Sequence, residues 1–367
     1  MAKLLIVHWG RTAAGPALTL KLVKALLADG RHEVAVSYSG VADIASDFRD
    51  LDCPQYEVRT WRGAKDMPGV MFRLPGLIRG LRAFMRQQGT TTTLVPMEHP
   101  LQSLAAWAFR SRGSRYVHFM HDASLHPGEQ SPVVALLRKA HLRPAQDIVV
   151  FSGSVEQGVI KDWKIPADRV HLSQLPPMFD DGGERMARSL DENRATVCGM
   201  FGRAVEYKGF DLAVEAVAAL RSRGHDIVLR LVGGGVTAFV PEQYKDQPWL
   251  QVEDRWLADD EIIGVMEGFD ILLLPYKEAS QSGVLVEAAA LGLPVVTTPV
   301  GGLPEQLNAL GCGEVAGQLT GEAVAGAIKV LATDPERYRA CSESGLRSGS
   351  GGQAWARLLA DIEPLLQ

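Results

Sequence analysis

The stretch FDILLLPYKEASQSGVLVEAAALGLPVVTTPVGGLPEQL (269–307) decides the fold of this 367-residue chain. A buried strand is predicted over 270–274, a polar loop runs to Gly283, a helix follows, and a second buried strand covers 294–298. Continuous apolar strands separated by one helix are typical of a parallel sheet covered by helices. The stretch therefore predicts one βαβ unit of an α/β protein.

The same alternation of short apolar runs and longer helical segments continues over the whole chain. It predicts one set of strands at 3–8, 33–38, 92–95, 115–120 and 147–151, and a second set at 196–201, 227–232, 250–253, 270–274 and 294–298. The Pro- and Gly-bearing segment 174–195 between the sets reads as a linker. We expect two Rossmann-like, doubly wound domains, 1–180 and 181–353. SESGLRSGSGGQ (342–353) reads as a flexible crossing, after which a helix in 354–367 packs back on the first domain.

Composition excludes several classes of protein. The four cysteines lie far apart without a CxxC pair, which indicates neither a disulfide framework nor a thiolate zinc site. No secretory signal and no apolar run of the roughly 18 residues needed to span a bilayer is visible. We therefore expect a cytoplasmic protein.

The net charge of −5 conceals an uneven distribution of charge. Residues 1–190 hold 24 basic and 18 acidic side chains, net +6, which leaves −11 for residues 191–367. The surplus of basic residues arises within 51–150, with 13 basic and 7 acidic groups. A partner specific to the N-terminal half is therefore worth considering.

CGMFGRAVEYKGFDLAVEAVAAL (198–220) places two cations between a strand and a helix. Gly202 permits a tight turn, and Arg203 and Lys208 lie in the loop that opens the helix. Cations beside free amides at a helix start are suited to a diphosphate. The alternative is a loop with two solvated cations, and the position after a strand favours the phosphate site.

The loop over 277–283 and the helix that follows it form a second candidate segment. Ser280, Gln281, Ser282 and Gly283 offer small side chains and open amides, so an anion or sugar hydroxyls could approach closely. Glu287 stands one turn into an otherwise apolar helix. It either faces solvent or is buried against a hydroxyl-rich partner, and periodicity alone favours the solvent-facing position.

Taken in order, these segments carry a resemblance. The order is G-R-x4-K-G, V-G-G-G, D-R-W-L, D-I-L-L-L-P, G-V-L-V-E-A and G-L-P-V-V-T-T-P-V-G-G-L-P-E, and it covers 196–310. It resembles the C-terminal domain of retaining glycosyltransferases of GT-B fold, family four, group 1 type, which build bacterial polysaccharides and glycolipids. The resemblance implies two Rossmann-like domains that face each other across a cleft.

The resemblance also implies site residues. Arg203 and Lys208 would hold the diphosphate of a nucleotide-sugar donor and stabilise the leaving group, so no metal or other cofactor is expected. Glu287 would bind the donor ribose, and Arg255 and Trp256 the base. The whole expected donor-binding set is Gly10, Gly15, Arg203, Lys208, Arg255, Trp256, Ser280, Gln281, Ser282, Gly283, Val284 and Glu287.

One departure from the family pattern affects the donor sugar. The family shows two glutamates eight residues apart, and Ala279 stands eight residues before Glu287. Either Glu278 is brought in by a shift of the loop, or Ser280, Gln281 and backbone amides alone bind the sugar, which we favour slightly.

In the N-terminal half, HWGRTAAGPALTLKLVKALL (8–27) fits the family's first loop, with Gly10 and Gly15. His121, just after a predicted strand, is expected to be a catalytic residue, because the family places a histidine near the donor sugar. Asp122 and His126 are expected on the acceptor side. The spacing of the histidines here matches no zinc ligand set.

MFRLPGLIRGLRAFMRQQG (71–89) offers a location for the surplus of basic residues. Arg79, Arg82 and Arg86 recur at spacings of three and four among apolar residues. Such a helix either lies on an anionic membrane surface or is an ordinary surface helix. Nucleic-acid binding is not expected, because interleaved aromatic residues are missing.

The resemblance implies a retaining hexosyltransferase that moves a sugar from a nucleoside-diphosphate sugar to a hydroxyl of a glycan or lipid-linked acceptor. It would act in the cytoplasm or on the inner face of the membrane, in polysaccharide or glycolipid biosynthesis. The alternatives are a non-catalytic nucleotide-sugar-binding partner subunit, which Ala279 favours, and a sugar-nucleotide epimerase of the same fold. The donor sugar, the base and the acceptor stay open.

Overall fold

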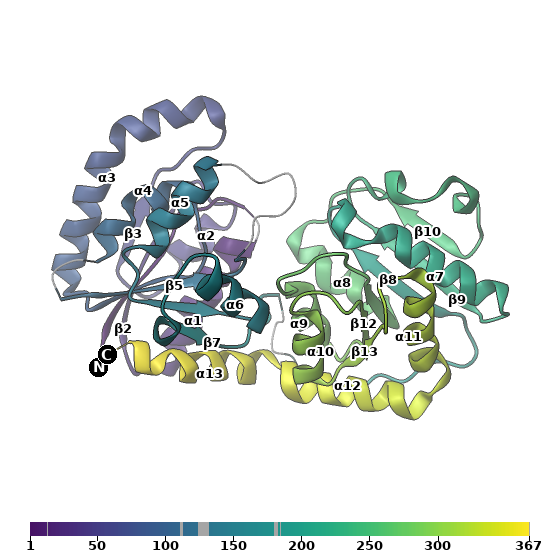
Figure 1. Cartoon of the computed structure of the whole chain (residues 1–367). Coiled ribbons are helices and arrows are strands. Elements are labelled where there is room, and N and C mark those ends of the chain that lie inside the picture. Colours follow the sequence, from purple (N-terminus) through teal and green to yellow (C-terminus); the bar gives the residue numbers. More distant parts are fainter. Residues whose placement is uncertain (13, 111–112, 124–131, 180–182, 184, 367) are drawn as a thin grey trace. The chain divides into compact units, whose positions relative to one another are not determined.

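The computed structural model describes residues 1–12, 14–110, 113–123, 132–179, 183 and 185–366. The chain divides into two compact units (Figure 1). Unit 1 comprises Met1–Gln174 and Trp355–Gln367, and unit 2 comprises Leu175–Ala354. The first division therefore lies at 174/175, six residues before the boundary predicted from the sequence. No helix in the described part of the chain is long and apolar enough to cross a membrane.

Unit 1 is built on a seven-stranded parallel sheet of order β3-β2-β1-β4-β5-β6-β7. Its strands are β1 (Lys3–His8), β2 (Glu33–Ser39), β3 (Gln55–Val58), β4 (Thr92–Val95), β5 (Arg115–Met120), β6 (Asp147–Val150) and β7 (Val170–Leu172). The central strands β1, β4, β5 and β6 are buried almost throughout, as expected for a parallel sheet covered on both faces.

The helices of unit 1 are α1 (Ala14–Asp29), α2 (Ala45–Arg49), α3 (Met67–Gln88), α4 (Pro100–Phe109), α5 (Pro132–Leu142), α6 (Gly153–Lys161) and α13 (Gly351–Ile362). Figure 1 shows α13 running along this unit to a C-terminus beside the N-terminus. Its end is fixed there, since His32 contacts Glu363 at 3.1 Å and the Thr92 hydroxyl donates to the Leu366 carbonyl at 3.0 Å.

Unit 2 is built on a six-stranded parallel sheet of order β10-β9-β8-β11-β12-β13. Its strands are β8 (Thr196–Phe201), β9 (Ile227–Val232), β10 (Leu250–Glu253), β11 (Ile271–Leu274), β12 (Val295–Thr297) and β13 (Gly313–Val315). Its helices are α7 (Phe210–Ser222), α8 (Ile262–Glu267), α9 (Gly283–Ala290), α10 (Leu303–Leu310), α11 (Gly321–Thr333) and α12 (Pro335–Gly349).

The structure confirms the two parallel α/β sheets and all ten predicted strands to within one residue at each end. Three further strands, β3, β7 and β13, were not predicted. They have three or four residues each and are partly exposed, so they lack the continuous apolar run of a central strand. They lie at the edges of the sheets, where one side of the strand needs no partner.

The predicted flexible crossing over 342–353 is wrong, because α12 and α13 occupy it with only Ser350 between them. The Ser342 hydroxyl is buried and donates to the Gly292 carbonyl at 2.6 Å. A Cβ on Gly345 or Gly349 would lie 3.1 or 2.8 Å from atoms of α9 or its neighbours. These small residues therefore allow α12 to pack closely on α9. Their composition alone had predicted a flexible segment.

Each sheet has one point where its strand order reverses direction. In unit 1 it lies between β1 and β4, and in unit 2 between β8 and β11. The loops that follow these strands diverge to opposite faces of the sheet and leave a crevice at its carboxyl edge, where doubly wound folds bind ligands. This topology places the loop after His8 and the loop after Phe201 at the two candidate sites.

Glycines hold the loops of unit 2 in close contact at this edge. Gly209 has φ +70° at the start of α7, and a Cβ there would lie 2.0 Å from the Pro275 carbonyl oxygen. Gly233 has φ +155°, and a Cβ there would lie 2.0 Å from the Gly202 carbonyl oxygen. The backbones after β8, β9 and β11 therefore approach one another more closely than any side chain permits.

We predict that Gly209→Ala destabilises unit 2 by about 3 kcal/mol or more, because it adds a collision with backbone to the cost of a left-handed conformation. Gly224→Ala is the matched control, with φ +84° and no atom within 4 Å of the added Cβ. It should cost roughly 1 kcal/mol. Urea unfolding of both variants checks the difference, and equal losses of stability would contradict the role assigned to Gly209.

Candidate functional site

Arg203 and Lys208 lie in the loop between β8 and α7, at the switch point of unit 2. Burial, followed by the positive charge of Arg203, lowers the pKa of Lys208 to about 8. Within the described residues, neither side chain makes an ion pair or a hydrogen bond. Two neighbouring cations without a carboxylate form a site that an anion would stabilise.

The local backbone positions the Lys208 ammonium. A Cβ on Gly202 would lie 2.7 Å from Lys208 Nζ, so a side chain at this position would collide with the ammonium. The Lys277 N–H donates to the Tyr207 carbonyl at 2.6 Å, which joins this loop to the one after β11. The Lys277 ammonium forms an ion pair with Asp211, with 2.8 Å between Nζ and Oδ2. The two loops of the switch point thus form one connected surface.

Glu287 is buried in α9, with 1% of its surface exposed. The solvent-facing position favoured by periodicity is therefore wrong, because α9 is surrounded from Leu285 to Ala290. Its carboxylate accepts backbone N–H groups of Met178 and Phe179, the latter at 3.1 and 3.2 Å. These bonds compensate for the burial of the carboxylate and fix its orientation.

The loop before α9 has a fixed shape. Ser282 is the N-cap, and its hydroxyl accepts the Leu285 N–H at 3.3 Å. Gln306 bonds both backbone groups of Ser282, at 2.9 and 3.1 Å. The Gly302 N–H donates to the Ala279 carbonyl at 3.3 Å. Ser280, Gln281, Gly283 and Val284 are half-buried in this loop and the first turn, whereas Glu278 is exposed.

Arg255 and Trp256 follow β10. Arg255 is ion-paired with Glu261 at 2.9 Å, and Trp256 is 73% exposed beside Gly234. Asp254, the first residue of the turn that carries Arg255 and Trp256, accepts the N–H groups of Gly235 and Thr237 at 2.7 and 3.1 Å. Hydrogen bonds from Thr237 and Gly235 lower its pKa. Asp254 thereby holds the glycine turn after β9 against the turn that carries the exposed indole.

Unit 1 has a cavity of about 300 Å³ at its own switch point. It includes the predicted residues Gly10 and Gly15, in the loop after β1 and at the start of α1. The remaining lining residues follow β1, β3 and β4, and they are His8, Arg11, Thr12, Thr60, Trp61, Arg62, Met97, Glu98 and His99. The cavity therefore combines an aromatic ring with several hydrogen-bonding groups.

His8 presents an unprotonated ring nitrogen to this cavity. Burial, together with the charges of His99 and His121, lowers its pKa to about 3, so the ring is neutral. Nδ1–H donates to the Met97 carbonyl at 3.3 Å, which leaves Nε2 as an acceptor. A Cβ on Gly10 or Gly15 would lie 2.3 Å from Nε2. Both glycines are needed to keep space in front of this nitrogen.

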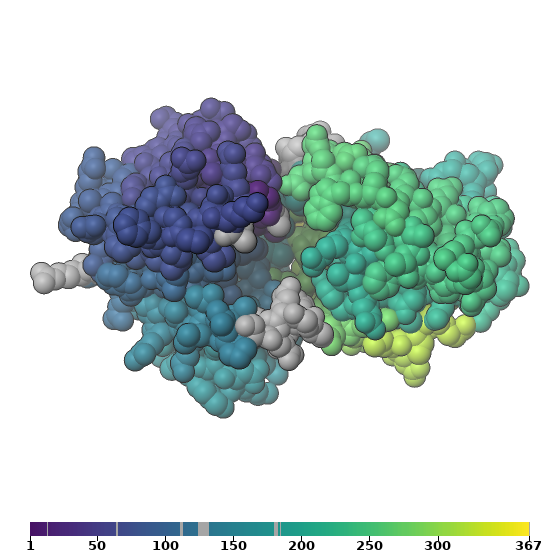
Figure 2. All heavy atoms as spheres, turned by 90° about the horizontal axis from the view of Figure 1, so that it is seen from above, coloured from purple at the N-terminus to yellow at the C-terminus, as the bar shows by residue number. Residues whose placement is uncertain are grey.

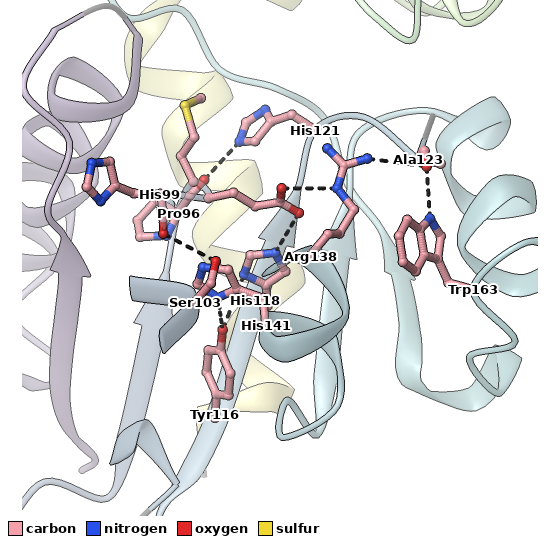
Figure 3. Close-up of polar contacts among 12 residues, drawn as sticks. Pro96, His99, Ser103, Tyr116, His118, His121, Ala123, Arg138, His141 and Trp163 are labelled. Atoms are coloured by element: carbon pink, nitrogen blue, oxygen red, sulfur yellow. Dashed lines mark hydrogen bonds and ion pairs between the residues drawn. The ribbon is translucent and has the colours of Figure 1, made fainter. Parts of the chain in front are cut away.

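A buried polar network lies behind the cavity (Figure 3). Glu98 contacts Arg138 at 3.1 Å and His118 at 3.5 Å, and the Tyr116 hydroxyl bonds His141 at 2.9 Å. Burial raises the pKa of Glu98, but the hydrogen bond from His118 and the charges of His118 and Arg138 lower it to about 2. Glu98 is therefore an ionised wall of the cavity, held in place from behind.

His121 lies next to this network. Its Nε2–H donates to the Pro96 carbonyl at 2.8 Å, and burial lowers its pKa (Figure 3). The ring is thus oriented by the segment that also carries Met97 and Glu98. Asp122 is half-buried beside it. His126 falls outside the described residues, as does Glu129.

No group of three His, Cys, Asp or Glu side chains within the part of the chain that the structure describes is arranged to hold a metal ion. The described histidines of unit 1 instead contact backbone carbonyls, Tyr116, one another or the carboxylates of Glu98, Asp147 and Glu363. His118 and His141, for example, stack at 4.9 Å between ring centroids. His118 is buried inside β5, and its Nε2 lies 3.5 Å from the Glu98 carboxylate.

Comparison with known proteins identifies the fold and its family. Residues 195–334 match the family "Glycosyl transferases group 1", and residues 15–174 match "Glycosyl transferase 4-like domain". The chain belongs to the group 1, family 4-like glycosyltransferases. The two matches fall on the two units, and the fold is GT-B.

Relatives and solved structures agree with this family. D-inositol 3-phosphate glycosyltransferase of Segniliparus rotundus is 26% identical over 298 residues, which cover 75% of this chain and 66% of the relative. Sucrose-phosphate synthase of Thermosynechococcus elongatus has a TM-score of 0.74 at 16% identity, covering 100% and 99% of the two chains. Anabaena HepE in complex with UDP and glucose has a TM-score of 0.71 at 15% identity, covering 99% and 100%.

The chain spans less than two thirds of the length of several curated relatives that it matches. The structures share too little sequence to show more than the fold. Membership in the glycosyltransferase family therefore stands, while the reaction of this protein is argued from its own residues.

The cavity residues His8, Trp61, Glu98 and His99 were missed from the sequence. His8 ends a predicted strand, and Glu98 and His99 follow another, so their position after strands at the switch point was a usable signal. Trp61 follows β3, an edge strand that the sequence did not reveal. The position of Trp61 in the cavity lining could therefore be recognised only from the fold.

Proposed function

We propose that the protein is a retaining glycosyltransferase that moves a hexose from a nucleoside-diphosphate sugar to a hydroxyl of a glycan or lipid-linked acceptor. The observation that carries the proposal is a pair of cations at the switch point of unit 2, Arg203 and Lys208, for which the described part of the chain holds no carboxylate partner. A diphosphate supplies the negative charge that this pair lacks. HepE, which has the same fold, is described with UDP and glucose bound, in agreement with such a donor.

In the proposed reaction the bond between the sugar C1 and the diphosphate oxygen breaks while a bond from the acceptor oxygen to C1 forms on the same face. The proton of the acceptor hydroxyl passes to the departing diphosphate. Arg203 and Lys208 stabilise the charge that builds up on the diphosphate, which can contribute several kcal/mol in a preorganised site. They stabilise the leaving group as a metal ion does in other glycosyltransferases, so the proposal requires no metal and no cofactor.

The other donor contacts follow from the positions of the loops. Glu287 binds the ribose hydroxyls in this proposal, with its carboxylate oriented by the amides of Met178 and Phe179. Trp256 offers an exposed face to the base, with Arg255 held beside it by Glu261. The loop from Ser280 to Gly283 binds the sugar through hydroxyls and backbone amides. Glu278 is exposed, which supports binding of the sugar without a first glutamate.

Unit 1 binds the acceptor in this proposal, so Gly10 and Gly15, expected from the sequence to contact the donor, line the acceptor cavity instead. The cavity at its switch point suits a ring with several hydroxyls, because Trp61 offers an apolar face while His8 Nε2 and Glu98 accept hydrogen bonds. His121 acts at the donor sugar as a catalytic residue, with Asp122 and His126 on the acceptor side. We place the protein in the cytoplasm, in the synthesis of polysaccharide or glycolipid.

A non-catalytic nucleotide-sugar-binding subunit is the second candidate, favoured by Ala279 in place of the first glutamate. The two candidates share the donor site and differ in turnover. Release of nucleoside diphosphate from a donor by the purified protein therefore separates them.

We predict that UDP binding protonates Lys208. With a pKa of about 8, the Lys208 side chain of the unliganded protein is largely a neutral amine at pH 9, and a bound diphosphate favours the charged ammonium. Calorimetry in buffers of different ionisation enthalpy should therefore show uptake of about one proton per UDP at pH 9 and almost none at pH 7. Lys208→Met should remove the uptake and weaken binding about tenfold or more.

Lys245→Met is the matched control, since Lys245 is a surface lysine of unit 2 paired with Glu242. It should leave both affinity and proton uptake unchanged. UDP, GDP and ADP are each tried as the nucleotide. Binding of none of them, or uptake that persists in Lys208→Met, would refute the donor site.

We predict a separate role for His8 in acceptor binding. His8→Phe keeps the bulk of the ring and removes the Nε2 acceptor, so kcat/KM for the acceptor should fall about tenfold or more while the affinity for UDP stays unchanged. His8→Gln should retain more activity, because its amide oxygen can accept the same bond. Transfer is measured to the most active compound of a panel of free sugars and polyols.

His171→Phe is the control, because His171 lies on the edge strand β7 and bonds Asp147 at 3.0 Å. It should leave transfer unchanged. If His8→Phe weakens UDP binding and leaves acceptor use intact, the cavity belongs to the donor instead.

A further inference from the structure

Three neighbouring helices of unit 1, α3, α4 and α5, contain no acidic residue. Their sequences are MPGVMFRLPGLIRGLRAFMRQQ, PLQSLAAWAF and PVVALLRKAHL. They lie next to one another (Figure 1), and the blue of α3 adjoins the teal-blue of the segments that follow it on the face seen in Figure 2. The surplus of basic residues in the N-terminal half is therefore concentrated on one surface.

The outward side chains of these helices combine cations with large apolar groups. We call this set the basic–apolar surface, and it consists of Met71, Phe72, Arg79, Arg82, Arg86, Leu104, Trp107, Arg110, Val133, Leu136, Lys139 and Arg143. On α3 the members recur at helical spacing, with Phe72, Arg79 and Arg86 seven residues apart. They share a face distinct from the buried stripe of Val70, Leu74, Ile78, Leu81 and Met85.

Side-chain contacts make the surface continuous across the three helices. The Arg82 guanidinium lies 4.0 Å from the centre of the Trp107 ring, which joins α3 to α4. A groove of about 750 Å³ joins α4 to α5. Leu104, Trp107 and Leu136 form its apolar lining, and Arg110, Lys139 and Arg143 form its charged border.

The apolar exposure of this surface is unusual within the molecule. Phe72 is 89% exposed, Leu136 67% and Trp107 52%. Eight of the fifteen large apolar side chains that are exposed in the described part of the chain belong to α3, α4 and α5, which hold 43 residues. Exposed apolar residues gathered in this way mark an interaction site, whereas scattered ones need no explanation.

We propose that the basic–apolar surface binds an anionic phospholipid bilayer. Charge complementarity selects an anionic partner, because six cations face outward without an acidic neighbour on these helices. The apolar side chains select a bilayer over a nucleic acid or an acidic protein, since Phe72 and Leu136 would gain nothing from a phosphate backbone. This extends the membrane contact expected for 71–89 from one helix to three.

The arrangement fits shallow insertion at the headgroup level. Phe72, Val133 and Leu136 reach the acyl boundary, and the Trp107 ring lies at the interface, where indoles are preferred. The arginines and Lys139 have long apolar stems with charged ends, which contact phosphates while the stems lie along the apolar groups. The groove between α4 and α5 holds the headgroup of one lipid.

Sedimentation with vesicles tests the proposal on the full chain. Vesicles of 7:3 phosphatidylcholine and phosphatidylglycerol should bind the protein, and vesicles of phosphatidylcholine alone should not. Each basic side chain near an anionic surface strengthens binding by about fivefold, so Arg79→Glu/Arg86→Glu should weaken it roughly 25-fold or more. Phe72→Ser/Leu136→Ser should weaken binding to the same vesicles at unchanged net charge.

Two control variants separate the surface from general charge. Arg73→Glu reverses an exposed cation of α3 on the opposite flank of the helix, and it should retain binding. Lys329→Glu/Val330→Ser changes a similar basic and apolar pair on α11 of unit 2, where Val330 is 43% exposed, and should also retain it. Circular dichroism of each variant confirms that it is folded.

Three outcomes would overturn the proposal. The first is failure of the wild-type protein to bind anionic vesicles. The second is a loss of binding in Arg73→Glu equal to that in Arg79→Glu/Arg86→Glu. The third is vesicle binding that Phe72→Ser/Leu136→Ser does not change, together with tighter binding to an oligonucleotide. The last result would assign the surface to a polyanion. Because the vesicles contain no nucleotide, the outcome is independent of the proposed glycosyl transfer.

Discussion

Two cations that repel each other, Arg203 and Lys208, lie together at the switch point of unit 2 and have no carboxylate partner among the described residues. Burial and the neighbouring guanidinium disfavour the ammonium of Lys208, whose pKa is lowered to about 8. The loops around it are held by close approaches that only glycine allows, at Gly202, Gly209 and Gly233. A folded chain that keeps two cations together in this way carries a cost that a bound anion removes, and this is why the site is best explained by a diphosphate.

The site of unit 1 follows a different principle. The two histidines that line its cavity, His8 and His99, are neutral, because burial lowers the pKa of His8 to about 3 and that of His99 to about 4. Glu98 carries the one buried negative charge of the cavity wall, and Arg138 balances it from α5. Arg11 and Arg62 also line the cavity, which therefore offers hydrogen-bond donors as well as acceptors to hydroxyl groups. The cation pair of unit 2 suits phosphate. In the proposed function, the switch point of unit 2 binds the donor and the switch point of unit 1 binds the acceptor.

Much of the fold was predictable because strand and helix periods are local properties of the sequence. The ten predicted strands followed from short apolar runs, and Arg203 and Lys208 from their position between a strand and a helix. Glu287 could not be placed by periodicity, because its partners, the amides of Met178 and Phe179, lie more than a hundred residues away. The cavity of unit 1 depends on three separate strand ends, one of them on the unpredicted strand β3. The glycines and serines of 342–353 have the composition of a linker, yet their role is the packing of α12 on α9.

α5 connects two properties of unit 1. Its Arg138 points inward to Glu98 and stabilises the cavity wall, while Lys139 and Arg143 face outward on the basic–apolar surface. One helix therefore supports both the cavity proposed for the acceptor and the surface proposed for the bilayer. A lipid-linked acceptor would bring these two features into use together.

The central claim is that Arg203 and Lys208 hold the diphosphate of a donor that the protein turns over. Phosphorus NMR of the purified protein with UDP-glucose, GDP-mannose and ADP-glucose measures this directly, since the free nucleoside diphosphate and the intact donor give separate signals. The account predicts release of diphosphate from one of these donors and its loss in Arg203→Ala/Lys208→Met. Release at an equal rate in that double variant, or no release from any donor, would contradict it.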